Sequence, residues 1–260
     1  MPTALDPTTK QLPSYGTSDH YLGEKGKEYW SWQRGSGMFG ARINSHKFRH
    51  LIRPSDTVID FGCGGGFLLK TLECMERIGV EINPSAREHA TSLGIKCYSE
   101  VSQVPDAAAD VIVSDHALEH VPYPIGALKE LRPKLKPDGR LALCVPINNW
   151  RLDKKYDPHD PNHHLHTWTP QLLGNSLSDA GYEVLEIYAR IFAWPGKWTV
   201  ATYGRLPYWM FSADLLLVWM VKGIWLGNFS DSARTYRRLS SDKSMWRFPL
   251  ICENETCATN

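Results

Sequence analysis

The stretch Val58-Ile59-Asp60-Phe61-Gly62-Cys63-Gly64-Gly65-Gly66 decides the fold of this chain. It begins with β-branched apolar residues, as a buried parallel strand requires, and Asp60 stands where that strand ends. The alternating glycines after Asp60 let the backbone turn tightly and approach a bound molecule without side-chain interference. The apolar residues that follow predict a helix over residues 65–75, and its N-terminal amides face the same place.

A second acidic residue, Glu81, closes the next apolar strand, which we expect over residues 77–81. A carboxylate at this strand end is placed to accept hydrogen bonds from the two hydroxyls of a ribose. The turn departs from the dinucleotide pattern G-x-G-x-x-G, because its third glycine is Gly66 and Phe67 comes next. An acid two residues before Gly62 also suits a cationic amine better than a pyrophosphate. The residues therefore favour a nucleoside ligand that carries a cationic amine.

On Asp60-x-Gly62-x-Gly64-x-Gly66 and the correctly spaced Glu81, the sequence resembles the class I S-adenosylmethionine-dependent methyltransferases, whose first motif is D/E-x-G-x-G-x-G. Two later stretches also resemble that family, Asp-His-Ala-Leu-Glu-His-Val over 115–121 and Leu-Lys-Pro-Asp-Gly-Arg-Leu over 135–141. The first of these is common in the small-molecule branch that includes ubiquinone-biosynthesis methyltransferases. The resemblance covers about residues 50–190 and implies an enzyme that methylates a small molecule.

The resemblance also implies S-adenosylmethionine as the cofactor. In the family an acid after the third strand reaches the adenine amino group, which here is Glu100, and Ile82 would pack against the adenine face. The cofactor-binding residues that follow from the resemblance and from position are Asp60, Gly62, Gly64, Gly66, Glu81, Ile82, Glu100 and His116.

Alternating apolar strands and helices predict an α/β fold with a doubly wound, mostly parallel sheet. We expect strands over 56–61, 77–81, 95–98, 110–114, 140–145 and 183–187, and helices over 65–75, 84–93, 124–133 and 170–180. Pro84 suits a first helical position, Thr169 a cap and Gly181 a helix end. The resemblance implies seven strands, of which residues 245–252 would supply a last, antiparallel one.

Four regions follow from this assignment: a tail and helical cap over 1–50, the cofactor-binding core over 51–192, an aromatic-rich helical insertion over 193–242, and a last strand and tail over 243–260. Within the first region we expect a mobile tail over 1–14, and from residue 15 short helices packed over a pocket. The insertion holds five of the ten tryptophans, and its apolar stretch 206–226 contains Asp214 and Lys222, so it fails as a membrane span. Two interpretations remain open for it: a helical lid or homodimer surface, and peripheral contact with a membrane or lipid-like acceptor.

The chain has 260 residues and a formal net charge of +1, with acidic and basic residues mixed, so electrostatics gives no reason to expect nucleic acid as a partner. Its six cysteines mostly lie scattered within predicted core elements, which is typical of reduced thiols. The N-terminus lacks a basic and then apolar signal segment. We therefore expect a cytoplasmic protein that acts on a small-molecule acceptor.

Methyl transfer from a sulfonium is an in-line displacement, so most of the rate can come from positioning the two reactants. A hydroxyl acceptor is helped by a general base, for which histidine is the default. The candidates are His120, after the fourth strand, and the histidines of the loop 157–166, among which we favour His163 and then His166. A structural hydrogen bond is the alternative for His120, and the loop matches no common zinc spacing. A non-catalytic nucleoside-binding module is the alternative for the whole chain, although the intact acids and glycines argue against it.

Overall fold

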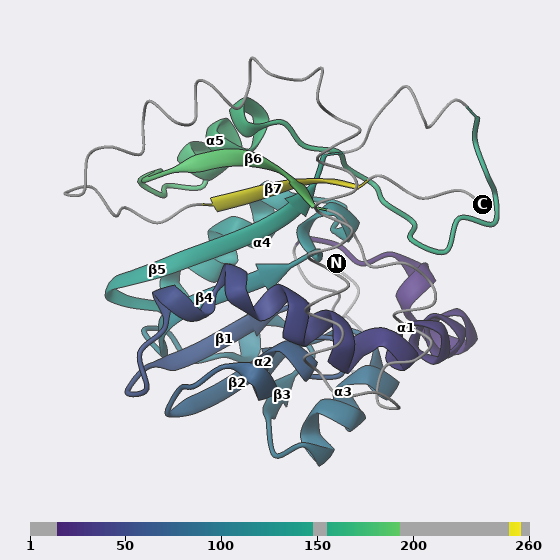
Figure 1. Cartoon of the computed structure of the whole chain (residues 1–260), viewed down its shortest axis with the longest axis horizontal. Helices are drawn as coiled ribbons and strands as arrows, with labels where there is room; N and C mark the ends of the chain where they lie inside the picture. Colours follow the sequence, from purple (N-terminus) through teal and green to yellow (C-terminus); the bar gives the residue numbers. More distant parts are fainter. Residues whose placement is uncertain (1–14, 148–154, 193–249, 256–260) are drawn as a thin grey trace, which may run out of the picture.

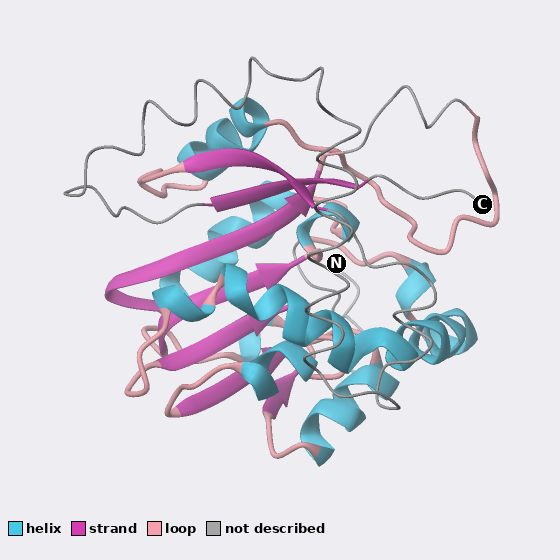
Figure 2. Cartoon of the chain, in the orientation of Figure 1, coloured by secondary structure: helices cyan, strands magenta, loops and turns pink. Residues whose placement is uncertain are grey.

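The structure, a computed structural model, describes residues 15–147, 155–192 and 250–255 (Figure 1). Its strands are β1 Thr57–Phe61, β2 Glu76–Val80, β3 Lys96–Tyr98, β4 Ala109–Asp115, β5 Leu135–Pro146, β6 Ile187–Phe192 and β7 Leu250–Glu255. Its α-helices are α1 Gly23–Asn44, α2 Phe67–Thr71, α3 Pro84–Ser92, α4 Pro124–Leu131 and α5 Pro170–Asp179. Figure 2 shows helices on both faces of one twisted sheet.

The strands follow the order β3-β2-β1-β4-β5-β7-β6, so the chain reverses its direction of travel across the sheet between β1 and β4. The pairs among β1 to β5 are all parallel, and Asp60 of β1 stands beside Gly79 of β2 and Val113 of β4. The prediction of a doubly wound parallel sheet is thereby confirmed for these strands. Ligands bind such sheets at the reversal point, beyond the carboxyl ends of the strands.

Two apolar cores hold the helices on the sheet. On one face, where α1 contacts both α2 and α3, Leu69 of α2 and Ala90 of α3 are buried with Val58 of β1. On the other face, Leu128 of α4 and Leu173 of α5 are buried in a second cluster. Figure 1 shows α1 running across the front of the sheet and α4 behind it. Both cores position the carboxyl ends of the central strands without occupying them.

The last strand differs from its prediction. β7 begins at Leu250, not at Met245, and it lies parallel to both β5 and β6, not antiparallel. A parallel neighbour needs a crossover connection of about a dozen residues or more, and residues 193–249 between β6 and β7 provide far more than that. The prediction that β6 occupies 183–187 is wrong as well, because the strand begins at Ile187. Val184 packs on the core without joining the ladder, while Leu185 is 60% exposed.

The N-terminal cap, where short helices were expected, consists of one α-helix of 22 residues, α1, with short 3-10 helices before and after it at Asp19–Tyr21, Ser45–Lys47 and Arg49–Leu51. Its glycines suggested breaks, yet they serve close packing. A Cβ on Gly37 would lie only 2.2 Å from Cε2 of Phe67, and Gly26 lies as tightly against the carbonyl of Tyr21. The helix can therefore rest directly on the first glycine turn and on α2. The helix ends predicted from single residues are confirmed: Pro84 starts α3, Thr169 caps α5 through Leu172, and Gly181 follows α5 with φ +86°.

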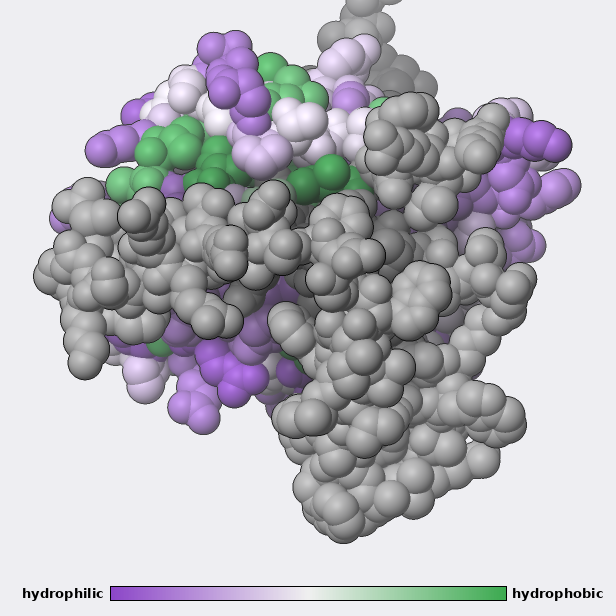
Figure 3. Space-filling model, turned by 45° about the horizontal axis from the view of Figure 1, so that its top comes forward, coloured by the Kyte–Doolittle hydropathy of each residue, from purple (hydrophilic) through white to green (hydrophobic). Residues whose placement is uncertain are grey.

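Within the described part of the chain, no helix is long and apolar enough to cross a membrane. Figure 3 shows apolar side chains gathered on one face among hydrophilic ones. The cysteines at positions 63, 74, 97 and 144 are free thiols. The expected tail 1–14 and the insertion 193–242, with the lid, dimer and membrane interpretations attached to it, lie outside the described residues.

Candidate functional site

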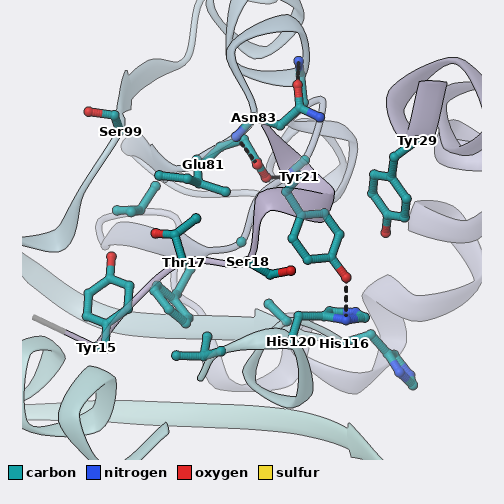
Figure 4. Close-up of a pocket in the computed structure, with 18 of the residues that line it drawn as sticks. Tyr15, Thr17, Ser18, Tyr21, Tyr29, Glu81, Asn83, Ser99, His116 and His120 are labelled. Carbon is teal, nitrogen blue, oxygen red and sulfur yellow. Dashed lines mark hydrogen bonds between the residues drawn. The ribbon is translucent and has the colours of Figure 1, made fainter. Parts of the chain in front are cut away.

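A pocket opens at the carboxyl ends of β1, β2 and β4, where the chain reverses direction (Figure 4). It holds about 780 Å³ of space that no atom fills, open solvent included. Its floor comes from the glycine turn and the loop after β2, and its walls come from the N-terminal segment and the turn after β4. The residues that line it include Tyr15, Tyr21, Tyr29, Gly62, Gly64, Glu81, Ile82, Asn83, Ser99, His116 and His120.

The glycine turn has the backbone that its sequence predicted. Gly62, Gly64 and Gly66 have φ values of +76°, +50° and +77°, a region that favours residues without a Cβ. At Gly62 space is also decisive, since a Cβ there would lie 2.2 Å from Cβ of Ala117 in the turn after β4. Gly62 and Gly64 line the pocket, whereas Gly66 begins α2 and packs against Ala90 of α3. Two of the three predicted glycines therefore face the ligand space, and the third brings helices together.

Glu81 lies in the pocket floor and ties two loops together. Its Oε2 accepts a hydrogen bond from the amide of Gly64 at 2.8 Å, and its Oε1 accepts one from the amide of Asn83 at 2.7 Å. Burial raises the pKa of Glu81, while these two amides oppose the rise by stabilising the carboxylate. Each carboxylate oxygen has further lone pairs, so Glu81 can also accept bonds from ligand hydroxyls.

Asp60 lies beneath the turn and not in the pocket wall. It is buried, with 2% of its surface exposed, and its Oδ1 has no hydrogen-bond partner among the described residues. Burial, and then the nearby carboxylates of Asp115 and Glu81, raise the pKa of Asp60 well above its usual range. A buried carboxyl with an unpartnered oxygen fits a place where a ligand cation or donor completes the site.

Of the two residues predicted to contact the adenine, Ile82 and Glu100, only Ile82 lines the pocket. Ile82 lines the pocket as expected, but Glu100 is not among the lining residues, and its carboxylate instead accepts a bond from Ser102 at 3.3 Å. The preceding residue, Ser99, does line the pocket and is labelled in Figure 4. A contact between Glu100 and a ligand stays a prediction, and Ser99 is a lining residue that sequence reasoning missed.

His116 and His120 are the two histidines in the pocket wall, on either side of Glu119. His116 Nδ1 lies 3.3 Å from Glu119 Oε1, and His120 Nε2 lies 3.8 Å from the same oxygen. Burial lowers the pKa of His120, although the Glu119 carboxylate opposes that effect. The imidazole of His120 is therefore neutral at pH 7 and keeps one nitrogen lone pair.

A tyrosine from the N-terminal segment fixes which nitrogen of His120 carries the proton. Tyr21 Oη lies 2.7 Å from His120 Nδ1 and 3.1 Å from the carbonyl oxygen of Asn162 (Figure 4). His120 Nδ1 also lies 3.5 Å from the carbonyl oxygen of His163. Both carbonyls can only accept, so a proton on Nδ1 that faces Tyr21 and His163, with the Tyr21 hydroxyl proton pointing to Asn162, is the arrangement that leaves no two acceptors facing each other. We infer from this network that the lone pair of His120 is on Nε2, on the side of Glu119.

The loop histidines favoured from sequence lie elsewhere. His163 stacks on His20 with ring centroids 4.6 Å apart, and it does not line the pocket. His166 lines a second pocket, beside Trp168 and behind Pro122. The loop is anchored by its backbone, because the amides of Leu165 and His166 donate to the carbonyl of Glu119 at 2.9 and 3.1 Å. This anchoring brings the ring of His164, a loop histidine that the sequence analysis ranked below His163 and His166, to 5.0 Å from the ring of His120, measured between centroids.

Two further residues of the pocket, Tyr21 and Tyr29, were not predicted from the sequence as site residues. Their rings meet edge to face with centroids 5.0 Å apart, and burial raises the pKa of both well above the usual range, so both remain protonated. Tyr29 and Gln33 line the same pocket one helical turn apart on α1. Residues four apart lie on the same face of a helix, so the sequence could have placed Tyr29 and Gln33 together if the segment had been predicted as a single helix.

A buried ion pair supports the wall from behind. Lys47 Nζ lies 3.2 Å from Asp115 Oδ1 and 3.3 Å from Cys144 Sγ, while Asn44 donates to Asp115 Oδ2 at 2.8 Å. Burial alone would raise the pKa of Asp115, but Lys47 holds it below its usual range. The next residue, His116, has φ +56° and donates its amide to the carbonyl of Cys144. The ion pair thus fixes the end of β4 where the wall begins.

The sequence is similar to those of known proteins. A family model described as "Methyltransferase domain" matches residues 38–187, which is more than half of the chain. The mitochondrial ubiquinone biosynthesis O-methyltransferase of Schizosaccharomyces pombe is 33% identical over 152 residues, which cover 49% of this chain and 53% of that protein. The ubiquinone biosynthesis O-methyltransferase of Xanthomonas campestris pv. campestris strain B100 is 32% identical over 107 residues, covering 35% and 44%.

The chain thus spans about half the length of the curated relatives it matches. Among solved structures, a methyltransferase of Thermotoga maritima superposes with a TM-score of 0.50 at 21% identity, covering 61% of this chain and 77% of that one. At that identity the likeness concerns the fold alone.

Proposed function

Because this chain belongs to the class I S-adenosylmethionine-dependent methyltransferases, we propose that it transfers the methyl group of S-adenosylmethionine to a hydroxyl of a small molecule. The single observation that carries the proposal is one pocket in which cofactor-type and acceptor-type groups meet. Gly62, Gly64, Glu81 and His116, which we predict to bind the cofactor, line the same pocket as His120, which we predict to act on the acceptor. Transfer requires this arrangement, because both reactants must be held within reach of each other.

The residues present fit the cofactor. Glu81 offers carboxylate oxygens to ribose hydroxyls, and Gly62 and Gly64 line the pocket without side chains. The buried carboxyl of Asp60 beneath the turn has an unpartnered oxygen, which a donor or cation of the ligand would satisfy. When bound, S-adenosylmethionine supplies an electrophilic methyl group. The chain's own part is to orient that group, exclude water and receive the proton of the acceptor.

We assign the proton to His120 within this proposal. Its pKa is lowered, so the base form dominates at neutral pH, and the Tyr21 network leaves the lone pair on Nε2. Tyr21 and Tyr29 supply apolar faces with polar tips, which favours an acceptor with a ring or apolar surface. Hydroxyls of a sugar, a secondary metabolite or a lipid-linked glycan belong to this class, and the relatives named as O-methyltransferases support oxygen as the acceptor atom.

The regions outside the described residues enter the proposal through sequence alone. We propose that residues 193–242 form an insertion between the last two strands of a seven-stranded sheet and pack over the acceptor side of the pocket. A homodimer surface and peripheral contact with a lipid surface are the other roles open to it. Binding of the purified chain to anionic vesicles, lost in its Trp209→Ala and Trp219→Ala variants, would identify the lipid contact and set it apart from the other two roles.

The test of the function uses methyl-labelled S-adenosylmethionine and a panel of acceptors: an alkyl-substituted catechol, simple glycosides and a polyprenyl-linked sugar. We expect label transfer to at least one class, and His120→Ala to lower turnover by about 10²–10⁴ while cofactor affinity stays unchanged. His163→Ala and His166→Ala are the matched controls, since neither residue lines this pocket. Cofactor binding without transfer to any acceptor would favour the alternative, a non-catalytic nucleoside-binding or partner-binding module on the same fold.

A further inference from the structure

Two thiols meet behind the glycine turn that lines the pocket. Cys63 lies in that turn between Gly62 and Gly64, and Cys97 lies in the middle of β3. Their Sγ atoms are 3.7 Å apart, and both residues are free thiols. Neither has a part in the function proposed above, so their meeting calls for an account of its own.

The sheet brings the two sulfur atoms together over Gly79 of β2. Cys97 stands directly beside Gly79 in the parallel pair of β2 and β3, and the amide of Cys63 donates to the carbonyl of the next β2 residue, Val80, at 3.2 Å. A Cβ on Gly79 would lie 2.6 Å from Cys63 Sγ and 2.9 Å from Cys97 Sγ. Any side chain at position 79 would therefore push into the space that the two sulfur atoms share, and the glycine leaves it to them.

A disulfide bond between these residues requires only a small movement. The S–S bond is about 2.05 Å long, so the two sulfur atoms must approach each other by about 1.7 Å. Both segments that carry them can yield. β3 has three residues and lies at the edge of the sheet, and the turn holds Cys63 between two residues that have no side chain.

The two thiols differ in exposure, and this difference sets the order of the chemistry. Cys63 is buried, whereas Cys97 is partly exposed, so an oxidant from solvent reaches Cys97 first. Hydrogen bonding with the Cys63 thiol lowers the pKa of Cys97, which favours the thiolate, the form that reacts. Cys63 then lies next to the oxidised sulfur, in the place of a resolving thiol.

We propose that Cys63 and Cys97 form a reversible disulfide when the protein meets hydrogen peroxide, and that the oxidised protein binds S-adenosylmethionine more weakly. The Cys97 thiolate attacks one peroxide oxygen, so the S–O bond forms as the O–O bond breaks, and the departing hydroxide takes up a proton to become water. Cys63 Sγ then attacks Cys97 Sγ. The S–S bond forms as the S–O bond breaks, and the second oxygen leaves as water with the proton of Cys63. Two thiols are thereby oxidised, and one peroxide is reduced to two waters.

The new bond acts on the cofactor side of the pocket through both of its ends. The amide of Gly64, the residue after Cys63, donates to Glu81 Oε2 at 2.8 Å. Ser99, two residues after Cys97, lines the same pocket (Figure 4). Movement of Cys63 and Cys97 toward each other therefore displaces the Gly64 amide and the loop after β3 together. The inference depends on the cofactor alone, and not on the acceptor or on the proton acceptor proposed above.

The first measurement maps the bond in the full-length chain. The protein is reduced, freed of reductant and treated with hydrogen peroxide. Its remaining thiols are blocked with N-ethylmaleimide, and its peptides are analysed by mass spectrometry without reduction. We expect a peptide that joins Cys63 to Cys97 and disappears after treatment with dithiothreitol. Cys74→Ser is the matched control, because Cys74 is also a partly exposed thiol and its replacement should leave the link in place.

The second measurement is calorimetric titration of S-adenosylhomocysteine into both forms. Oxidised wild type should bind it at least about tenfold more weakly, which corresponds to one lost hydrogen bond to a carboxylate, and dithiothreitol should restore the affinity. Peroxide should leave the affinity of Cys97→Ser unchanged, and Cys97→Ala serves if the serine variant does not fold. By linkage, saturating S-adenosylhomocysteine should shift the equilibrium with glutathione toward the thiols by the same factor, about 30 mV for tenfold.

The outcomes separate this proposal from the proposed function. A sulfinic acid on Cys97 with no link to Cys63 overturns the disulfide. A link that leaves the affinity for S-adenosylhomocysteine unchanged overturns its effect on the cofactor. A loss of affinity that persists in Cys97→Ser assigns the sensitivity to another group and overturns both. None of these measurements uses an acceptor, so their failure leaves methyl transfer standing, and the absence of any acceptor leaves them valid.

Discussion

Replacing Glu81 by alanine tests the cofactor half of the pocket most directly. The carboxylate holds the amides of Gly64 and Asn83 at 2.8 and 2.7 Å and is the group placed to accept the ribose hydroxyls. A hydrogen bond to a charged group contributes about 1.5–3 kcal/mol, so two ribose bonds amount to about 3–6 kcal/mol. Water replaces part of this in the variant. If water replaces one of the two bonds in full, the net loss is one hydrogen bond of about 1.5 kcal/mol. This smallest loss raises the dissociation constant about tenfold.

The measurement is calorimetric titration with S-adenosylhomocysteine, which binds without reacting. Glu81→Ala should raise its dissociation constant at least about tenfold. Glu88→Ala, an exposed position on α3, is the control and should leave it unchanged. The variant also deprives two backbone amides of their acceptor, which costs about 1–3 kcal/mol of stability for each amide left buried and unpaired. Denaturant unfolding therefore accompanies the titration, and both are run where the variant is fully folded. An unchanged dissociation constant in a folded Glu81→Ala protein would refute the role of Glu81.

Three further outcomes follow from the same geometry. Gly62→Ala should lower the free energy of unfolding by at least about 1–3 kcal/mol through backbone strain, measured from denaturant midpoints. Adding Ala117→Gly should recover only the part that comes from the 2.2 Å contact between a Cβ at position 62 and the Cβ of Ala117. Lys47→Met should cost about 3–5 kcal/mol at neutral pH by leaving Asp115 buried and unpaired. In the wild type the pKa of Asp115 is lowered, so its contribution to the free energy of unfolding is present above about pH 4 and is lost as the pH falls through the pKa of the folded protein. In the variant, burial without Lys47 raises that pKa. The difference in unfolding free energy between variant and wild type should therefore shrink as the pH is lowered. Tyr21→Phe should lower turnover and leave S-adenosylhomocysteine affinity unchanged, because it releases His120 and touches no part of the glycine turn; equal turnover would show that the tautomer needs no tyrosine.

The cofactor half of the pocket was predictable because its residues are close in sequence. The segment from Val58 to Asn83 contains the strand end, the glycine turn and Glu81, and a single βαβ unit brings them together whatever the rest of the chain does. Helix ends fixed by a single residue, such as Pro84 and Thr169, were equally predictable, since caps act locally. The last strand was not. Its direction depends on a crossover that no local pattern encodes.

The acceptor half was predictable only in part, because three distant segments build it. Sequence reasoning found the histidines but ranked His163 and His166 first, although only backbone anchoring at Glu119 decides which loop residue faces inward. Glu119 itself gave no signal beyond its place in the motif after β4. The tyrosines of α1 were visible as aromatics, yet their inward face depended on recognising one continuous helix across its glycines.

The two halves are joined through Asn83, and this connection explains how a variable wall can serve a fixed cofactor. Its amide donates to Glu81, its Oδ1 caps α3 through the amide of Ser85, and its Nδ2 donates to the carbonyl of Gly26 on α1 at 2.7 Å. The helix that carries Tyr29 is therefore positioned from the cofactor loop. Since the wall is positioned by a backbone carbonyl, side chains along α1 can change without disturbing Glu81. Acceptor choice is then free to diverge on α1 and on the histidine loop while the glycine turn stays as the cofactor requires.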